Sequence, residues 1–167
     1  DLHLTKYSSE LTQFIIDTAN QKKPDLILFG GDYVDTDGGL KYLNAIFKVI
    51  GQQYPSVAIS GNHDMFFGID KIEKIASIHN IKWCNSNELL LIKDLKINIH
   101  RFASIPSPDK SDIDILLLHQ PINPSKIEYA YDLVLAGHLH GCQFVFYRKD
   151  EYLYPGAFIY KNNFLKK

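Results

Sequence analysis

The stretch that decides the fold is residues 26–31, Leu-Ile-Leu-Phe-Gly-Gly, a short apolar run that ends at two glycines. A continuous apolar run of this length is typical of a strand buried on both faces. Apolar residues recur at helical spacing in 11–19 and 40–50, residues 57–59 form a second apolar run, and a third helical pattern lies at 69–76. This alternation of strand and helix predicts α/β architecture with parallel neighbours.

The second half of the chain is richer in strands. Residues 89–92 and 97–99 flank a polar turn and predict a β-hairpin. Further strands are predicted at 113–118, 133–136, 144–147 and 152–154. Because the sequence holds no internal repeat or linker, we expect a single domain over residues 1–167.

The composition is that of an ordinary globular protein. Of its 167 residues, 46% are apolar and 22% are charged, and no apolar run has the length needed to cross a bilayer. The formal net charge of -1 provides no general attraction for nucleic acid or anionic lipid. We therefore expect a soluble domain with a small-molecule or lipid substrate. Composition leaves open the oligomeric state and the location, in the cytoplasm or at a membrane surface.

Polar side chains directly follow four of the predicted strands. They are Asp32, Asn62 with His63, His119, and His138 with His140. Ligands of α/β sheets gather beyond the carboxyl ends of the strands, so we expect these side chains to converge on one rim. Each residue alone is more simply explained as a loop or capping residue, but their joint placement favours a shared site.

The residue types in this set favour transition metals. Imidazole and carboxylate together suit Mn, Fe, Zn or Ni, whereas an all-oxygen set suits Mg or Ca. A closed structural zinc site needs only four ligands, often thiolates, and Cys84 and Cys142 stand in no metal-binding spacing. The candidate ligands are too numerous for one ion and suit two ions that share a carboxylate: Asp1, His3, Asp32, Asn62, His119, His138 and His140.

Five short blocks carry a resemblance to a known family. In chain order they are Asp1-Leu2-His3, Gly31-Asp32-Tyr33-Val34-Asp35, Gly61-Asn62-His63-Asp64, His119 and Gly137-His138-Leu139-His140. Together they resemble the signature of the calcineurin-like metallophosphoesterase superfamily. Residues 30–33 and 138–143 also resemble its bacterial phosphodiesterase branch, which includes lipid pyrophosphatases. The resemblance implies an α/β (α+β) fold of two packed mixed β-sheets flanked by helices, with the first strand missing from this chain and the domain truncated before Asp1.

The resemblance also implies a ligand set for each of two divalent transition-metal ions. The sets are Asp1, His3 and His140 for the first ion and Asn62, His119 and His138 for the second. Asp32 would bridge the ions, with one oxygen facing each, at a separation of roughly 3.5–4 Å. We expect Mn²⁺, with Fe, Zn or Ni as alternatives, and a hydroxide between the ions would attack phosphorus.

One further histidine resembles a catalytic residue of the family. His63 would act as the general acid or bind phosphate, and either Asp64 or Asp35 would orient it. The sequence therefore predicts a hydrolase that cleaves a phosphoester by a two-metal mechanism, with a phosphodiester or pyrophosphate favoured.

Three other functions are weighed against this prediction. A nuclease of the same superfamily is disfavoured by the near-neutral charge. A catalytically impaired metal-binding scaffold that acts through a partner is expected to have lost ligands. A dimetal oxidase or hydrolase of carbon substrates would not need Asn62 and His63 together.

Several residues outside the five blocks have simpler interpretations. Residues 65–67, Met-Phe-Phe, could form an apolar lip, although inward packing is favoured. His79 and His100 are predicted to be surface residues. Arg101 and Arg148 are candidate phosphate contacts that the sequence does not place.

Overall fold

The first half of the chain forms a parallel sheet with helical crossovers. The computed structural model describes residues 1–103, 110–138, 145–149, 152–155 and 165–166. The strands of this sheet are β1 (Ile27–Phe29), β2 (Ser56–Ala58) and β3 (Lys82–Trp83), in the order β1-β2-β3. The connecting helices are α1 (Ser9–Lys22), which precedes β1, α2 (Leu40–Gln53), α3 (Asn62–Phe67) and α4 (Ile69–Ile78), with a 3-10 turn at Asp37–Gly39.

The second half forms a mixed sheet and a small antiparallel one. The mixed sheet has the order β4-β5-β6-β7, in which β4 and β5 pair as a hairpin and β5, β6 and β7 run parallel. These strands are β4 (Asn87–Ile92), β5 (Leu95–His100), β6 (Ile113–Leu118) and β7 (Leu133–Ala136), with a 3-10 turn at Pro124–Lys126. The small sheet contains β8 (Val145–Lys149), β9 (Tyr152–Pro155) and β10 (Leu165–Lys166).

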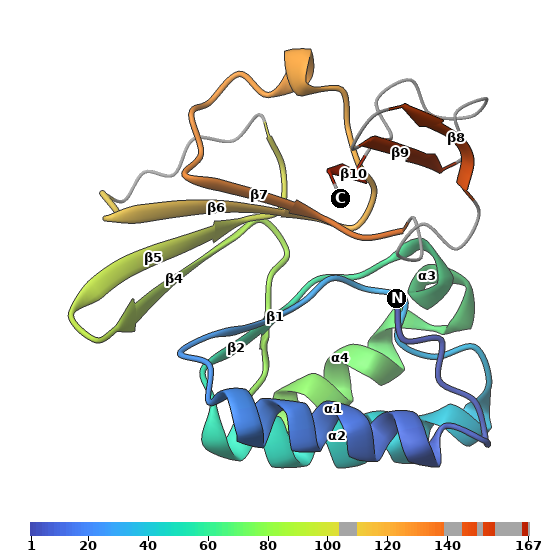
Figure 1. Ribbon diagram of the computed structural model, residues 1–167. Coiled ribbons are helices and arrows are strands. Elements are labelled where there is room, and N and C mark those ends of the chain that lie inside the picture. The colour runs from blue at the N-terminus through green and yellow to red at the C-terminus, as the bar shows by residue number, and fades with distance from the viewer. Residues whose placement is uncertain (104–109, 139–144, 150–151, 156–164, 167) are drawn as a thin grey trace.

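The β1-β2-β3 sheet lies between the helices and the mixed sheet (Figure 1). Successive side chains of a strand point to opposite faces. Phe29 and Ala58 accordingly pack against α2 and α4, whereas Leu28 and Val57 pack against the mixed sheet. The hydrophobic core between the two sheets also contains Cys84, and burial raises the pKa of its thiol to about 11. The two packed sheets flanked by helices agree with the predicted fold class.

The structure differs from the sequence-based expectation in several elements. Residues 62–64 were expected in a loop but form the first turn of the short helix α3. Strand β3 was not predicted, since two residues are too few to display a period. His100 was expected at the surface, but only 1% of it is exposed, and it pairs with Asp114 at 2.7 Å inside the mixed sheet.

The described helices include none whose length and apolar character would allow it to cross a membrane.

Candidate metal centre

The polar residues predicted from the strand ends lie together in the structure. Asp32 follows β1, Asn62 begins α3 after β2, His119 follows β6 and His138 follows β7. The N-terminal segment lies alongside the β1 loop, because the backbone N–H groups of Leu2 and His3 both donate to the carbonyl of Asp32. Figure 1 shows the N-terminus beside α3. The carboxyl ends of strands from both large sheets therefore meet at this rim.

Three of the candidate ligands have an uncommon backbone conformation. His3, Asp32 and His138 have φ values of 47°, 55° and 68°, in the left-handed region that residues with a Cβ rarely adopt. Such a conformation costs of order 1–3 kcal/mol per residue and persists where surrounding contacts enforce it. At these three candidate ligand positions, the surrounding contacts therefore fix the direction of the side chain at the expense of a preferred backbone conformation.

The buried carboxylate of Asp64 connects the loop after β1 to the loop after β2. Asp64 is fully buried, and its two oxygens accept backbone N–H groups of Asp32, Tyr33 and Gly61, each at 2.8 Å. The loops approach so closely that a Cβ on Gly31 would overlap the backbone of Gly61. Asp64 was one of two candidates for orienting His63, but both of its oxygens are directed to these amides.

His119 is fixed so that one ring nitrogen faces a set of acceptors. Its Nδ1 lies 2.7 Å from the carbonyl oxygen of Gly30, which can only accept, so this bond places the proton on Nδ1. Nε2 then presents a lone pair. It lies 2.9 Å from Asn62 Oδ1, 3.2 Å from Asp32 Oδ2 and 3.3 Å from a ring nitrogen of His138, and we call these four residues the His119 group.

A second group of candidate ligands shares Asp32 with the first. Asp1, His3 and Asp32, which we call the His3 group, have ligand atoms within 4.8 Å of one another. The oxygen that faces His3 Nε2 at 3.7 Å is Oδ2, the same atom that faces His119. The sequence-based expectation gave one oxygen to each ion, whereas Oδ1 in the structure accepts the backbone N–H of His63 at 2.8 Å.

The third cluster at the rim contains His63. One carboxylate oxygen of Asp35 lies 2.8 Å from His3 Nδ1 and 3.2 Å from His63 Nδ1, and the two rings meet edge to face. Of the two carboxylates considered for His63, Asp35 is the one within hydrogen-bond distance. This contact links His63 to the His3 group.

Asp1 connects the N-terminus to the loop after β7. Its Oδ2 accepts the backbone N–H of His138 at 2.8 Å, and its Oδ1 lies 3.8 Å from His119 Nδ1. Burial lowers the pKa of its amino group, against the opposing effect of the Asp32 and Asp64 carboxylates. His140, the remaining predicted ligand, lies outside the described residues.

The donor set fits divalent metal ions. Carboxylate oxygen, amide oxygen and unprotonated imidazole are all lone-pair donors, and lone pairs converging at about 3 Å repel one another unless a proton or cation lies between them. The carbonyl behind His119 resembles the outer hydrogen bond that orients metal-bound histidines. The His3 and His119 groups therefore have the chemistry of two adjacent cation sites joined through Asp32.

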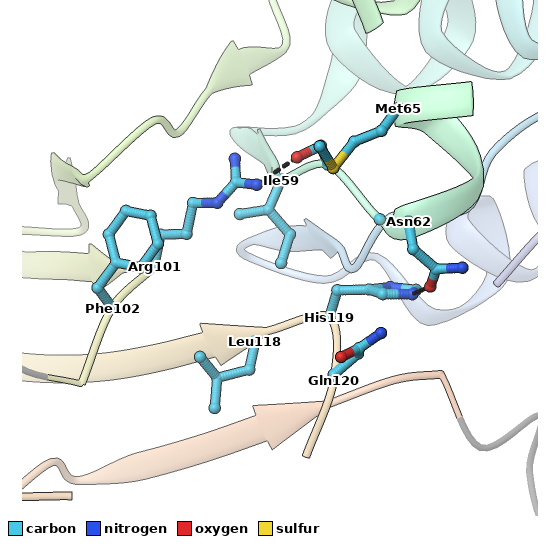
Figure 2. A pocket seen from close by; sticks show the side chains of 10 residues that line it. Ile59, Asn62, Met65, Arg101, Phe102, Leu118, His119 and Gln120 are labelled. Atoms are coloured by element: carbon cyan, nitrogen blue, oxygen red, sulfur yellow. Dashed lines mark hydrogen bonds between the residues drawn. The ribbon is translucent and has the colours of Figure 1, made fainter. Parts of the chain in front are cut away.

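Two residues near the site form hydrogen bonds that the sequence did not predict. Tyr33 is buried, its hydroxyl donates to the carbonyls of Phe29 and Ile59, and burial raises its pKa well above the ordinary value. It ties β1 to β2. The Arg101 guanidinium donates to Ser60 Oγ and to the carbonyl of Cys84, which places it in a cavity beside Asn62 and His119 (Figure 2).

The fold and this cluster define an α/β domain with candidate metal ligands where the strands of two packed sheets end. The model of the calcineurin-like phosphoesterase family matches residues 1–142. The chain therefore belongs to the calcineurin-like phosphoesterase family, which confirms the resemblance of the five blocks.

Individual relatives come from several bacteria. The chain is 28% identical to an uncharacterized metallophosphoesterase of Helicobacter pylori strain J99, over 86% of the chain and 43% of that protein. It is 30% identical to the uncharacterized metallophosphoesterase YkuE of Bacillus subtilis, over 86% of the chain and 57% of YkuE. It is 26% identical to the phosphodiesterase YaeI of Escherichia coli, over 86% of the chain and 59% of YaeI. The chain thus spans about half the length of these relatives.

Proposed function

We propose that this chain hydrolyses a phosphodiester or pyrophosphate bond with the help of two divalent metal ions, of which Mn²⁺ is favoured and Fe, Zn or Ni are alternatives. One observation carries the proposal. The Nδ1 of His119 is committed to the Gly30 carbonyl, so its Nε2 and the facing oxygens of Asn62 and Asp32 present lone pairs to one another. A shared cation is the simplest group that stabilises this arrangement.

The ligand sets follow from the two groups. The His3 group would hold one ion, with His140 as the further ligand assigned from the family resemblance, and the His119 group would hold the other. Bound there, two divalent ions would polarise the phosphoryl group and lower the pKa of an attacking water. Family membership and the name of the relative YaeI support a phosphoesterase.

The residues of the chain contribute positioning and proton transfer. Asp32 would lie between the two groups, held by the N–H of His63 on one oxygen and by Asp64 through its own N–H. Asp35 would orient His63, whose ring is half-exposed and so accessible to substrate. His63 would then donate a proton to the leaving oxygen or stabilise charge there.

The direct test combines metal analysis with turnover. The purified chain is stripped with a chelator, and metal content and hydrolysis of bis(p-nitrophenyl) phosphate are measured before and after Mn²⁺ is added. We expect two ions per chain and recovery of turnover with the second. If the metal-free protein hydrolyses the diester at the same rate, the proposal is wrong.

Two alternatives predict different results in the same assay. A nuclease would cleave duplex DNA faster than the diester, and its binding would weaken steeply with added salt, as expected when many phosphates are contacted. A metal-binding scaffold would bind the ions without turnover of any phosphoester. The net charge of -1 disfavours the first, and the sequence retains all seven predicted ligands, which disfavours the second.

A further inference from the structure

A cavity of about 300 Å³ adjoins the His119 group. Asn62 and His119 line one end of it, and Arg101 with Phe102 line the other end in Figure 2. Met65 also lines it. A group attached to a phosphorus at the metal ligands would therefore have space to enter this cavity.

Arg101 is held in this cavity by two neutral partners among the described residues. Two of its nitrogens donate to neutral oxygens, the hydroxyl of Ser60 and the carbonyl of Cys84. Within the described part of the chain, no carboxylate lies within the 4.0 Å ion-pair distance of the guanidinium. A guanidinium has five N–H donors, so donors remain for an anion.

The walls on either side of Arg101 are apolar. Met65 is 71% exposed and Phe102 is 45% exposed, and Leu118 lies in the same lining. Inward packing was favoured for residues 65–67 from the sequence, and it is wrong for Met65 and for Phe66, which is 90% exposed. Apolar surface next to a metal centre suits an aromatic or aliphatic group of the substrate.

We propose that this cavity, with Arg101 at its end and Met65 and Phe102 on its walls, binds an apolar substrate group that carries a second negative charge. The proposal rests on the proposed phosphodiesterase function and names the substrate class for it. The second anion is a carboxylate or a phosphate, since a guanidinium binds either in the same bidentate way.

A matched series of substrates tests the proposal. Phenyl p-nitrophenyl phosphate is compared with the analogues that carry a carboxylate or a phosphate at the para position of the phenyl ring. All three share one leaving group, so differences in kcat/KM report contacts with the second ring. We expect the anionic rings to be preferred by about ten-fold or more, through KM, as for a hydrogen bond between charged groups. The carboxylate and phosphate analogues identify which anion is favoured.

Variants assign the preference to named residues. Arg101→Met should abolish the preference for the anionic rings, whereas Arg101→Lys should keep part of it. Met65→Glu should reduce the preference by raising the KM of the anionic substrates relative to that of the uncharged one, and because Met65 is exposed the fold should tolerate it. Lys48→Met removes one charge from the exposed surface of α2 and should change nothing.

Binding gives a second readout that does not require turnover. Calorimetry with 4-carboxyphenyl methylphosphonate, which lacks the nitrophenyl leaving group, should show binding about ten-fold weaker in Arg101→Met than in the wild type. If Arg101→Met unfolds because its hydrogen bonds to Ser60 and Cys84 are lost, the effect of Met65→Glu on the anion preference tests the subsite instead.

The outcomes separate the two proposals. Equal rates on all three rings, or an anion preference that survives both Arg101→Met and Met65→Glu, would overturn the subsite and leave metal-dependent hydrolysis intact. Failure of the metal-loaded wild type to hydrolyse any of the three diesters would overturn the proposed function instead.

Discussion

The carboxylate of Asp64 accepts the backbone N–H of Asp32 at 2.8 Å, although the two residues follow different strands. Asp32 in turn accepts the backbone N–H of His63, the neighbour of Asp64, at 2.8 Å. Each loop thus fixes the other through a side chain. This reciprocal pair explains how Asp32 is kept in its left-handed conformation, and it makes the position of Asp32, the proposed shared ligand, depend on Asp64.

Asp64→Asn should therefore destabilise the protein and weaken metal binding together. The amide keeps the shape of the carboxylate but directs an NH₂ group at a backbone N–H, and the charge that strengthens these hydrogen bonds is lost. We expect a loss of about 3 kcal/mol or more in the free energy of unfolding, measured with urea. Metal analysis should show fewer than two ions per chain.

Asp37→Asn provides the control, because the Asp37 side chain is 80% exposed and forms only a surface ion pair with Lys71. Its effect should stay within about 0.5 kcal/mol. Equal effects of the two substitutions would contradict the structural role of Asp64.

Asp32→Ala should remove both ions, whereas Asp1→Ala should remove one. Asp32 belongs to both candidate groups, and its Oδ2 faces His3 and His119, while Asp1 belongs to the His3 group. Ions bound per folded chain are counted by elemental analysis after dialysis against Mn²⁺. Loss of both ions in Asp1→Ala and of only one in Asp32→Ala would reverse the assignment of the shared ligand.

The sequence predicted the strands and the α/β class because the strands are continuous apolar runs, whereas the two packed sheets were expected from the family resemblance. Burial leaves such a run few alternatives, which is why β1, β2 and β6 were recognised. The apolar run of β7 was recognised as well, although its residues are exposed. The helix α3 has six residues and β3 has two, so neither is long enough to show a period. Their positions follow from tertiary contacts rather than from local pattern.

The site could be predicted as a set of residue types but not as a geometry. Strand-end positions brought Asp32, Asn62, His119 and His138 together correctly. Asp64 cannot serve as the partner of His63 because its oxygens accept the backbone N–H groups of Asp32 and Tyr33. These residues lie 32 and 31 positions earlier in the chain, so a local sequence pattern could not have predicted the contacts. The left-handed backbone of His3 was likewise hidden, because tertiary hydrogen bonds impose it.

The carboxylate of Asp114, beside the buried ring of His100, predicts a dependence of stability on pH. Burial alone would raise the pKa of Asp114, but hydrogen bonds from His100, Ser111 and Tyr129 outweigh it and lower the pKa below its ordinary value. A carboxyl group with a lowered folded-state pKa contributes stability above its unfolded pKa of about 4, and this contribution is lost as the pH falls through the folded-state value.

Asp114→Asn should therefore be less stable than the wild type at neutral pH, and the difference should shrink below about pH 4. Urea unfolding of both proteins over the acid range measures it. Asp17→Asn, an exposed carboxylate on α1, serves as the control and should show no such trend. A difference that stays constant with pH would mean that Asp114 acts through packing rather than charge.

His63→Gln should slow substrates with poor leaving groups far more than those with good ones. The ring of His63 is oriented by Asp35 at 3.2 Å, while its backbone N–H is held by Asp32, so the side chain is positioned beside the predicted metal ligands. General acid catalysis is typically worth roughly 10²–10⁴-fold, and its value grows as the leaving group becomes more basic. An alkyl phosphodiester should therefore lose most of its turnover, and a p-nitrophenyl ester should lose little.

Both ions should stay bound in His63→Gln. The control is His79→Gln, which should behave as wild type because the ring of His79 contacts Asn44 on α2. Equal losses on the two substrates, or release of an ion, would identify His63 as a ligand or a structural residue, and the proton donor would then have to be another group at the rim.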